Sequence, residues 1–203
     1  MRPLRLLPVM MGLAFFADHE AAAELPGNSA DGWHTWTVTG ADSANGGCCF
    51  SWRGGVAQSN GCHLDGRHIT QGLGNDCISE SGRLQIYALL DAGKAIEVRA
   101  LSPQCSVTAD SEIADLGEVS PDQSIAWLEQ LLNVRGDLRL DAMAAISAHN
   151  TTQSVDALVR VIENRKISRN DREHALFWLV QSDSDQAFHY LDRMLAGRAS
   201  STR

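Results

Sequence analysis

Five cysteines between positions 48 and 105 are the residues of this chain with the clearest chemistry. They are Cys48, Cys49, Cys62, Cys77 and Cys105. Clustered cysteines in a small loop-rich domain of an oxidising compartment form disulfides, and five thiols allow at most two bridges, in fifteen arrangements. Cys48 and Cys49 should not bond each other, because the eight-membered ring would strain the peptide between them. On a strand their side chains point to opposite faces, so each should find a separate partner.

A metal site is the alternative for the same segment. Its ligands would be Cys48, Cys49, Cys62, His63 and His68. The spacing lacks the paired C-x2-C motifs of structural zinc sites, and no C-x-x-C indicates a redox pair. We therefore predict disulfides here, with no metal and no cofactor.

Motifs of common enzyme classes do not occur in the sequence. There is no G-x-S-x-G, no P-loop and no G-x-G-x-x-G. The histidines that follow residue 23 are scattered and are not tied to a nucleophile: His34, His63, His68, His149, His174 and His189. We predict no catalytic residue and a protein that is not an enzyme.

The first 23 residues have the pattern of a secretory signal peptide. Two arginines precede an uncharged, mostly apolar stretch over 6–17, and Ala21, Ala22 and Ala23 are the small residues that signal peptidase requires. Such a stretch reaches about 18 Å as a helix, short of the ~30 Å hydrocarbon core of a bilayer. We expect cleavage after Ala23, a periplasmic or secreted location, and no membrane insertion of the mature chain.

The net charge is −8, and the acidic surplus lies in the first part of the mature chain. Residues 24–119 carry 12 acids and 5 bases, whereas 120–203 carry 11 acids and 10 bases. This balance argues against nucleic acid as a partner, because nucleic-acid affinity comes from neutralised phosphates. It also argues against an anionic membrane surface.

Short β-type runs indicate that 24–119 is a small β-rich domain. They are 33–39, 49–52 and a hairpin over 83–101, in which Gly93 can take the positive φ of a tight turn.

Five helical segments are expected over 120–203. Start signals stand at 120–122, at Asn170-Asp171 and at Ser184-Asp185. Residues 139–163 align with 172–196 without a gap, an offset of 33 residues, so each unit is interpreted as one helix hairpin. In the last unit the inward-facing side chains would be Ala175, Leu176, Leu179, Phe188, Leu191 and Leu195.

The segment 120–197 resembles bacterial HEAT-like repeats of the PBS-lyase type. In the last unit the resemblance rests on Asp171-Arg172, Ala175, Leu179, the turn over 182–185, and Leu191. In the unit before, it rests on Asp137, Arg139, Ala142, Ile146, 150–152 and Leu158. Tetratricopeptide repeats fit less well, because Val180 and Ser147 stand where that family has a small residue after the central Leu.

The cysteine segment is similar to that of predicted exported HEAT-repeat proteins of proteobacteria. The residues that carry the likeness are Trp33, Trp36, 47–50 and 101–105. Together these resemblances imply an α+β protein. A β-rich disulfide-containing domain over 24–119 would precede a short α-solenoid of about two and a half HEAT-like helix hairpins over 120–203.

The function expected from such a fold is that of a periplasmic or secreted scaffold that holds a protein partner on its repeats. Arg160 and Arg193 occupy equivalent repeat positions and are the candidate residues of the interaction face. The alternative is a metal- or redox-sensing envelope protein that uses the cysteine-bearing β-rich domain over 24–119. Two structural expectations follow. The β-rich domain should cover the first helix, and Leu191→Ala should destabilise more than Leu128→Ala.

Overall fold

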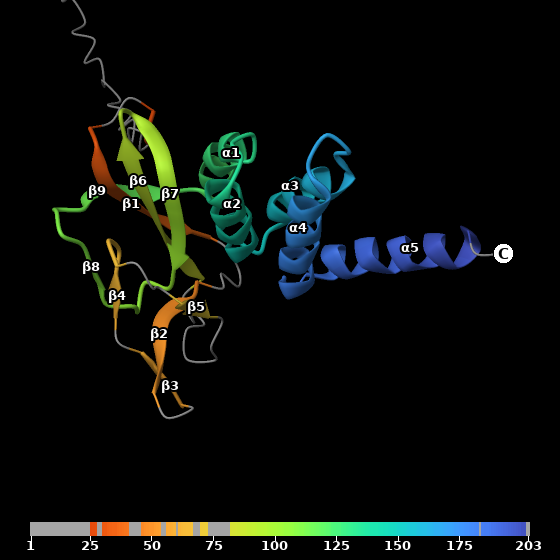
Figure 1. Ribbon diagram of the computed structural model, residues 1–203, viewed down its shortest axis with the longest axis horizontal. Coiled ribbons are helices and arrows are strands. Elements are labelled where there is room, and N and C mark those ends of the chain that lie inside the picture. The colour runs from red at the N-terminus through yellow and green to blue at the C-terminus, as the bar shows by residue number, and fades with distance from the viewer. Residues whose placement is uncertain are drawn as a thin grey trace, which may run out of the picture.

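The computed structural model describes residues 25–27, 30–40, 46–53, 56–59, 61–66, 70–72, 82–182 and 184–201. Within these residues nine strands precede five helices (Figure 1). The strands are β1 (Gly32–Thr39), β2 (Cys48–Arg53), β3 (Val56–Ser59), β4 (Cys62–His63), β5 (Thr70–Gly72), β6 (Arg83–Asp91), β7 (Lys94–Leu101), β8 (Val107–Thr108) and β9 (Ala114–Val119). The helices are α1 (Pro121–Leu131), α2 (Asp137–Ala148), α3 (Thr152–Glu163), α4 (Arg169–Gln181) and α5 (Asp185–Ser201). The predicted signal peptide, His68 and Cys77 lie outside the described residues.

The main sheet has four strands in the order β7-β6-β1-β9. β6 is antiparallel to β1 and to β7, whereas β9 runs parallel to β1. The predicted hairpin over 83–101 is confirmed as β6 and β7. Asp91 pairs with Lys94, so Ala92 and Gly93 form the turn, with φ values of 49° and 69°. Two successive positive φ values are those of a type I′ turn, whose twist matches that of the hairpin.

Two smaller sheets complete the β-rich part. β2 lies between β3 and β5, and β4 pairs with β8 in parallel. The predicted runs over 33–39 and 49–52 fall within β1 and β2. A disulfide from Cys49 to Cys62 joins β2 to β4, and one from Cys48 to Cys105 joins β2 to the segment between β7 and β8.

The helices begin at capping residues that the sequence provides. Ser120 forms a capping box with Gln123 and is followed by a proline at the start of α1, as predicted. α4 begins earlier than predicted, because the side chain of Ser168 caps it by accepting from the backbone N–H of Asp171. Asn170 therefore lies inside the helix. Among the described helices, none has both the length and the apolar character needed to cross a membrane.

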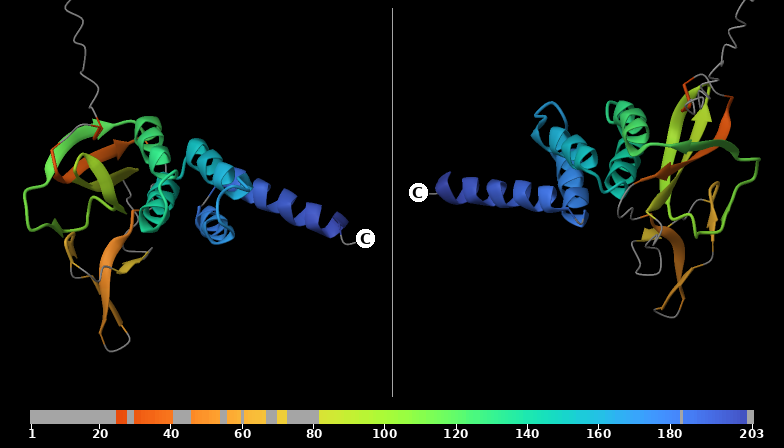
Figure 2. Two further views of the ribbon diagram at one scale, coloured as in Figure 1. Left: turned by 45° about the horizontal axis from the view of Figure 1, so that its top comes forward. Right: turned by 180° about the vertical axis from the view of Figure 1, so that it is seen from behind.

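One hydrophobic core joins the main sheet to the helices (Figure 2). Trp36 of β1 and Trp127 of α1 meet edge to face, with ring centroids 5.0 Å apart. The indole N–H of Trp36 donates to the hydroxyl of Ser124, also on α1, at 2.9 Å. Ile125 and Leu128 of α1 are fully buried in this core. The prediction that the β-rich part covers the first helix is therefore confirmed.

The predicted α-solenoid of two and a half hairpins is wrong. α2 is buried along most of its length, because β7 packs on it together with α1, α3 and α4. α5 extends away from the rest of the molecule, and its main contacts are with the neighbouring α4 and α3 (Figure 1). Stacked repeats would give successive hairpins similar surroundings, which these helices do not have.

The physical reason is visible at positions that the offset of 33 residues made equivalent. Leu158 is 1 % exposed, whereas Leu191 is only partly buried. Phe188 and Leu195, which the repeat pattern placed inside, are 67 % and 62 % exposed. Alanine and leucine at helical spacing occur in any amphipathic helix, so the alignment detected helices rather than a repeat. The apolar side that a solenoid would direct to the next hairpin is packed on the sheet in α1 and α2.

Candidate functional site

The four described cysteines are all bonded in disulfides. Cys48 and Cys105 have Cα atoms 5.6 Å apart, and Cys49 and Cys62 have theirs 5.1 Å apart. Each of the adjacent cysteines thus bonds a different partner, as expected. The alternative metal site of three cysteines and two histidines does not form, because its sulfurs are used in these bonds. Cys77 is the fifth cysteine and lies outside the described residues.

The Cys49–Cys62 disulfide belongs to a second, smaller core on the other side of the main sheet. Trp33, Tyr87 and Leu101 contribute from the sheet, and Leu64 follows Cys62 in the next turn. Cys62 and Leu64 are each 1 % exposed, and their burial determines the orientation of His63 between them and of Asp65 after them. Alternation along the chain therefore turns His63 and Asp65 outward to the solvent.

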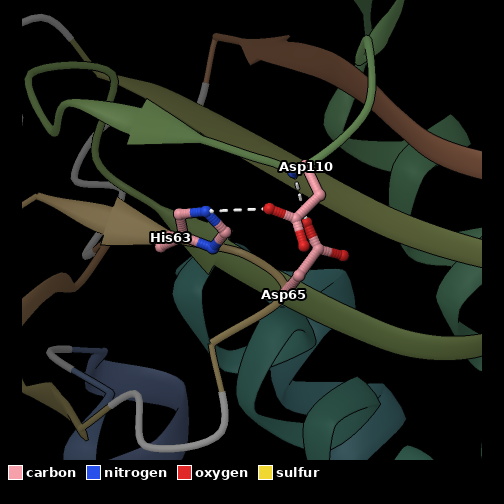
Figure 3. Close-up of side chains that lie close together, drawn as sticks. All are labelled: His63, Asp65 and Asp110. Carbon is pink, nitrogen blue, oxygen red and sulfur yellow. Dashed lines mark hydrogen bonds and ion pairs between the residues drawn. The ribbon is translucent and has the colours of Figure 1, made fainter.

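His63, Asp65 and Asp110 come together at this outer surface (Figure 3). The Nε2 atom of His63 lies 3.4 Å from Oδ1 of Asp110. The backbone N–H of Asp110 donates to Oδ2 of Asp65 at 2.7 Å. The parallel pairing of β4 with β8 brings Asp110 next to Asp65, which lies 45 positions earlier in the chain.

Asp65 is held in position by a buried tryptophan. The indole N–H of Trp33, which is 1 % exposed, donates to Oδ1 of Asp65 at 2.9 Å. This bond and the one from the Asp110 backbone lower the pKa of Asp65, with the Asp110 bond as the larger cause. The carboxylate is thus oriented and stays ionised. The three groups each offer a ligand atom, all within 4.8 Å of one another, which is an arrangement that could hold a divalent cation.

The predicted interaction residues Arg160 and Arg193 have different surroundings. Arg160 of α3 forms an ion pair with Glu129 of α1, so it links two helices. Arg193 is exposed on α5 and makes no ion pair with the described residues. Arg160 also borders a pocket of about 380 Å³ between α1 and α3.

Exposed apolar side chains concentrate on the last two helices. Of the six large hydrophobic residues that are exposed in the described part of the chain, four are on α4 and α5: Phe177, Val180, Phe188 and Leu195. Each is more than half exposed. On the inner sides, Ala175 and Leu179 of α4 are fully buried, as predicted, and Ala187 of α5 is 1 % exposed. Each of the two helices therefore has apolar side chains on a side that packs against the protein and on a side that faces the solvent.

Sequence reasoning missed two of these features. Asp110 had no signal, because only the strand pairing connects it with His63. The exposed apolar face of α4 is the second feature, because a repeat pattern predicts that this face is covered by the next hairpin.

In comparisons with known proteins, no protein family, no curated protein and no solved structure matches the chain.

Proposed function

We propose that the chain is an extracytoplasmic, non-enzymatic interaction protein that holds a protein partner against α4 and α5. The observation that carries this proposal is the exposure of Phe177, Val180, Phe188 and Leu195 on these two helices. Scattered apolar residues are normal on a protein surface, but apolar side chains gathered on neighbouring elements are typical of binding sites. The projecting position of α5 leaves this surface accessible (Figure 2).

The extracytoplasmic location rests on two further observations. Two disulfides stabilise the β-rich part, and structural disulfides persist in oxidising compartments. The sequence over 1–23 has the pattern of a cleaved export signal.

Photo-crosslinking at a single position tests the proposed surface. The photoreactive residue benzoylphenylalanine would replace Phe188 in one variant of the exported protein and Arg193 in another. Arg193 is the matched control, because it is also exposed on α5 but lies about 140° away around the helix. We expect a discrete crosslinked product from position 188 and none from position 193.

Three results would contradict the proposal. They are no product at position 188, equal products at both positions, or a product with the mass of two copies of the chain, which would mean self-association. A second pair of variants separates binding from folding. Phe188→Glu should abolish the product of a photoreactive residue at position 177, whereas Ile96→Glu, at another exposed apolar residue, should leave it unchanged.

Cation sensing is a second candidate function, and the cluster of His63, Asp65 and Asp110 favours it. An imidazole and two carboxylates suit Zn²⁺. Isothermal titration with Zn²⁺ should show one saturable site, and Asp110→Asn should weaken it at least about tenfold. Glu112→Gln, a change of a nearby exposed acid, is the control. The absence of a saturable site, or an equal loss in both variants, would exclude this function.

A further inference from the structure

A polar pocket of about 530 Å³ lies where the ends of α1 and α3 meet the beginnings of α2 and α4. Its charged lining residues are Arg135, Arg139, Lys166 and Asp171. Three cations thus face one anion in a chain whose net charge is −8. The pocket is therefore positively charged although the protein as a whole is negative, and it can attract an anionic group.

Arg139 is the fixed element of this pocket. It is 7 % exposed, and a buried cation is costly unless its donors are satisfied. Its Nε donates to the carbonyl of Leu132 at 2.9 Å, and its Nη1 donates to Oδ2 of Asp171 at 2.5 Å. These bonds hold the guanidinium plane in place. Nη2 makes no hydrogen bond with the described residues, and the side chain to which it belongs is a fixed, lining part of the pocket wall.

A second pocket continues the first toward α1 and α3. The two pockets share four lining residues: Leu132, Asn133, Asn164 and Ile167. The second, of about 380 Å³, adds the ion pair of Arg160 with Glu129 together with the apolar side chains of Ala157 and Val161. The combined groove therefore has an excess of positive charge at Arg135, Arg139 and Lys166, and an apolar part toward Arg160, whose charge Glu129 balances.

We propose that this groove binds an acidic segment of a protein partner, with a carboxylate of the segment at Arg139 and Lys166 and its aliphatic parts along the apolar part of the groove. The inference rests on the proposed function in one respect, namely that the partner is a protein, and it adds the chemistry of the segment that is recognised. The site is separate from the apolar side chains of α4 and α5.

The shape and charge of the groove favour a peptide over a small polyanion. Asp171 stays in the wall beside Arg139, and its negative charge opposes a compact group of high charge such as phosphate. Single carboxylates spaced along a chain place less charge at each point. Leu132, Ile167 and Val161 provide apolar contacts for the aliphatic parts of a peptide, which a phosphate ion would not use.

Fluorescence anisotropy with a labelled hexaglutamate peptide tests the proposal on the whole mature protein. Lys166→Glu is the informative variant, because Lys166 is exposed and makes no ion pair with the described residues, so the fold should tolerate it. Arg165→Glu is the matched control, since this adjacent exposed cation does not line either pocket. We expect Lys166→Glu to weaken peptide binding about tenfold and Arg165→Glu about twofold or less.

The other outcomes each have a definite meaning. No binding of the peptide, or equal losses in the two variants, overturns the proposal. Displacement of the peptide by millimolar inorganic phosphate shows a small-anion site instead and also overturns it. Displacement by single-stranded DNA at lower concentration than unlabelled peptide assigns the groove to nucleic acid and does the same. Loss of crosslinking at position 188 with intact peptide binding refutes the proposed function alone, so the two failures can be told apart.

Discussion

The Nε2 atom of His149 lies 2.9 Å from the hydroxyl oxygen of Ser124, in the fully buried junction between α2 and α1. Nδ1 of the same ring lies 2.8 Å from the carbonyl of Ala145, which can only accept, so Nδ1 carries the proton. Nε2 then accepts from Ser124, whose oxygen accepts from the indole of Trp36. The network is complete only with a neutral imidazole.

Acid should destabilise the protein through His149. Burial lowers the pKa of this group to about 4, below the ordinary value of 6.5 that it has in the unfolded chain. Between these values the unfolded state binds the proton, so stability present above pH 6.5 is lost as the pH falls toward 4. The loss from pH 7 to pH 5 should be roughly 2 kcal/mol. Urea unfolding at both pH values measures it, and in His149→Gln this part of the pH dependence should disappear. An unchanged slope would contradict the assignment.

Asp141 should act in the opposite direction. Burial is the main cause that raises its pKa to about 6, and the negative charge of Glu97 adds to it. The folded state therefore binds the proton more tightly, so stability is gained as the pH falls from about 6 toward 3.8. At pH 7 the charged carboxylate is unfavourable, and Asp141→Asn should stabilise by about 1 kcal/mol after solvent screening.

The effects of His149 and Asp141 on the pH dependence of stability partly cancel in the natural protein. The Asp141→Asn variant should therefore lose more stability between pH 7 and pH 5 than the natural protein does. Asp192→Asn, at an exposed acid on α5, is the control and should change neither value much. Destabilisation by Asp141→Asn at pH 7 would show that the carboxylate has a favourable partner.

The oxidised mature protein should contain one free thiol. Two disulfides use four of the five cysteines, which leaves Cys77. Alkylation under denaturing conditions without reductant should add one label, and peptide mapping should place it at Cys77. Three labels would mean that one bridge is missing.

Replacing both Cys48 and Cys105 by alanine should lower the free energy of unfolding by about 2–4 kcal/mol, because their bond closes a long loop. Denaturant unfolding of the variant and of the natural protein measures this difference.

Leu128→Ala should destabilise the protein more than Leu191→Ala, the reverse of the order that the repeat pattern predicts. Leu128 is fully buried between the sheet and the helices, whereas Leu191 is only partly buried on α5. A large-to-small change in a closed core costs about 2–5 kcal/mol, and less at a partly exposed position. Urea midpoints of the two variants provide the comparison. If Leu191→Ala proved the more damaging, α5 would have to pack more closely than this structure shows.

Local features of the fold could be predicted from the sequence because the residues responsible are adjacent in the chain. The turn at Ala92 and Gly93 and the cap at Ser120 depend on a few neighbouring residues. The packing of the helices could not be predicted in this way. Nothing in the sequence of α2 indicates that β7 will cover one of its sides, so the sequence alone does not distinguish helices of similar spacing from a repeat.

The candidate site shows the same limit. The sequence identifies His63 as a ligand type, but the partners that it predicts for His63 are mainly cysteines close in sequence. Its actual neighbour Asp110 arrives through the pairing of β4 with β8. The sequence places Arg139 in a repeat motif, whereas its burial against Asp171 is a property of the assembled helices. Charge and spacing identify candidates, but long-range pairing decides which of them meet.

The edge-to-face contact of Trp36 with Trp127 also gives the molecule a built-in optical reporter. One indole belongs to the sheet and the other to the first helix, and at 5.0 Å their excited states are coupled. Near-ultraviolet circular dichroism of this pair responds to the distance between the two layers, whereas the far-ultraviolet signal responds to the helices themselves. Separation of the layers without melting of the helices would therefore be seen as the loss of one signal while the other persists, with no added dye.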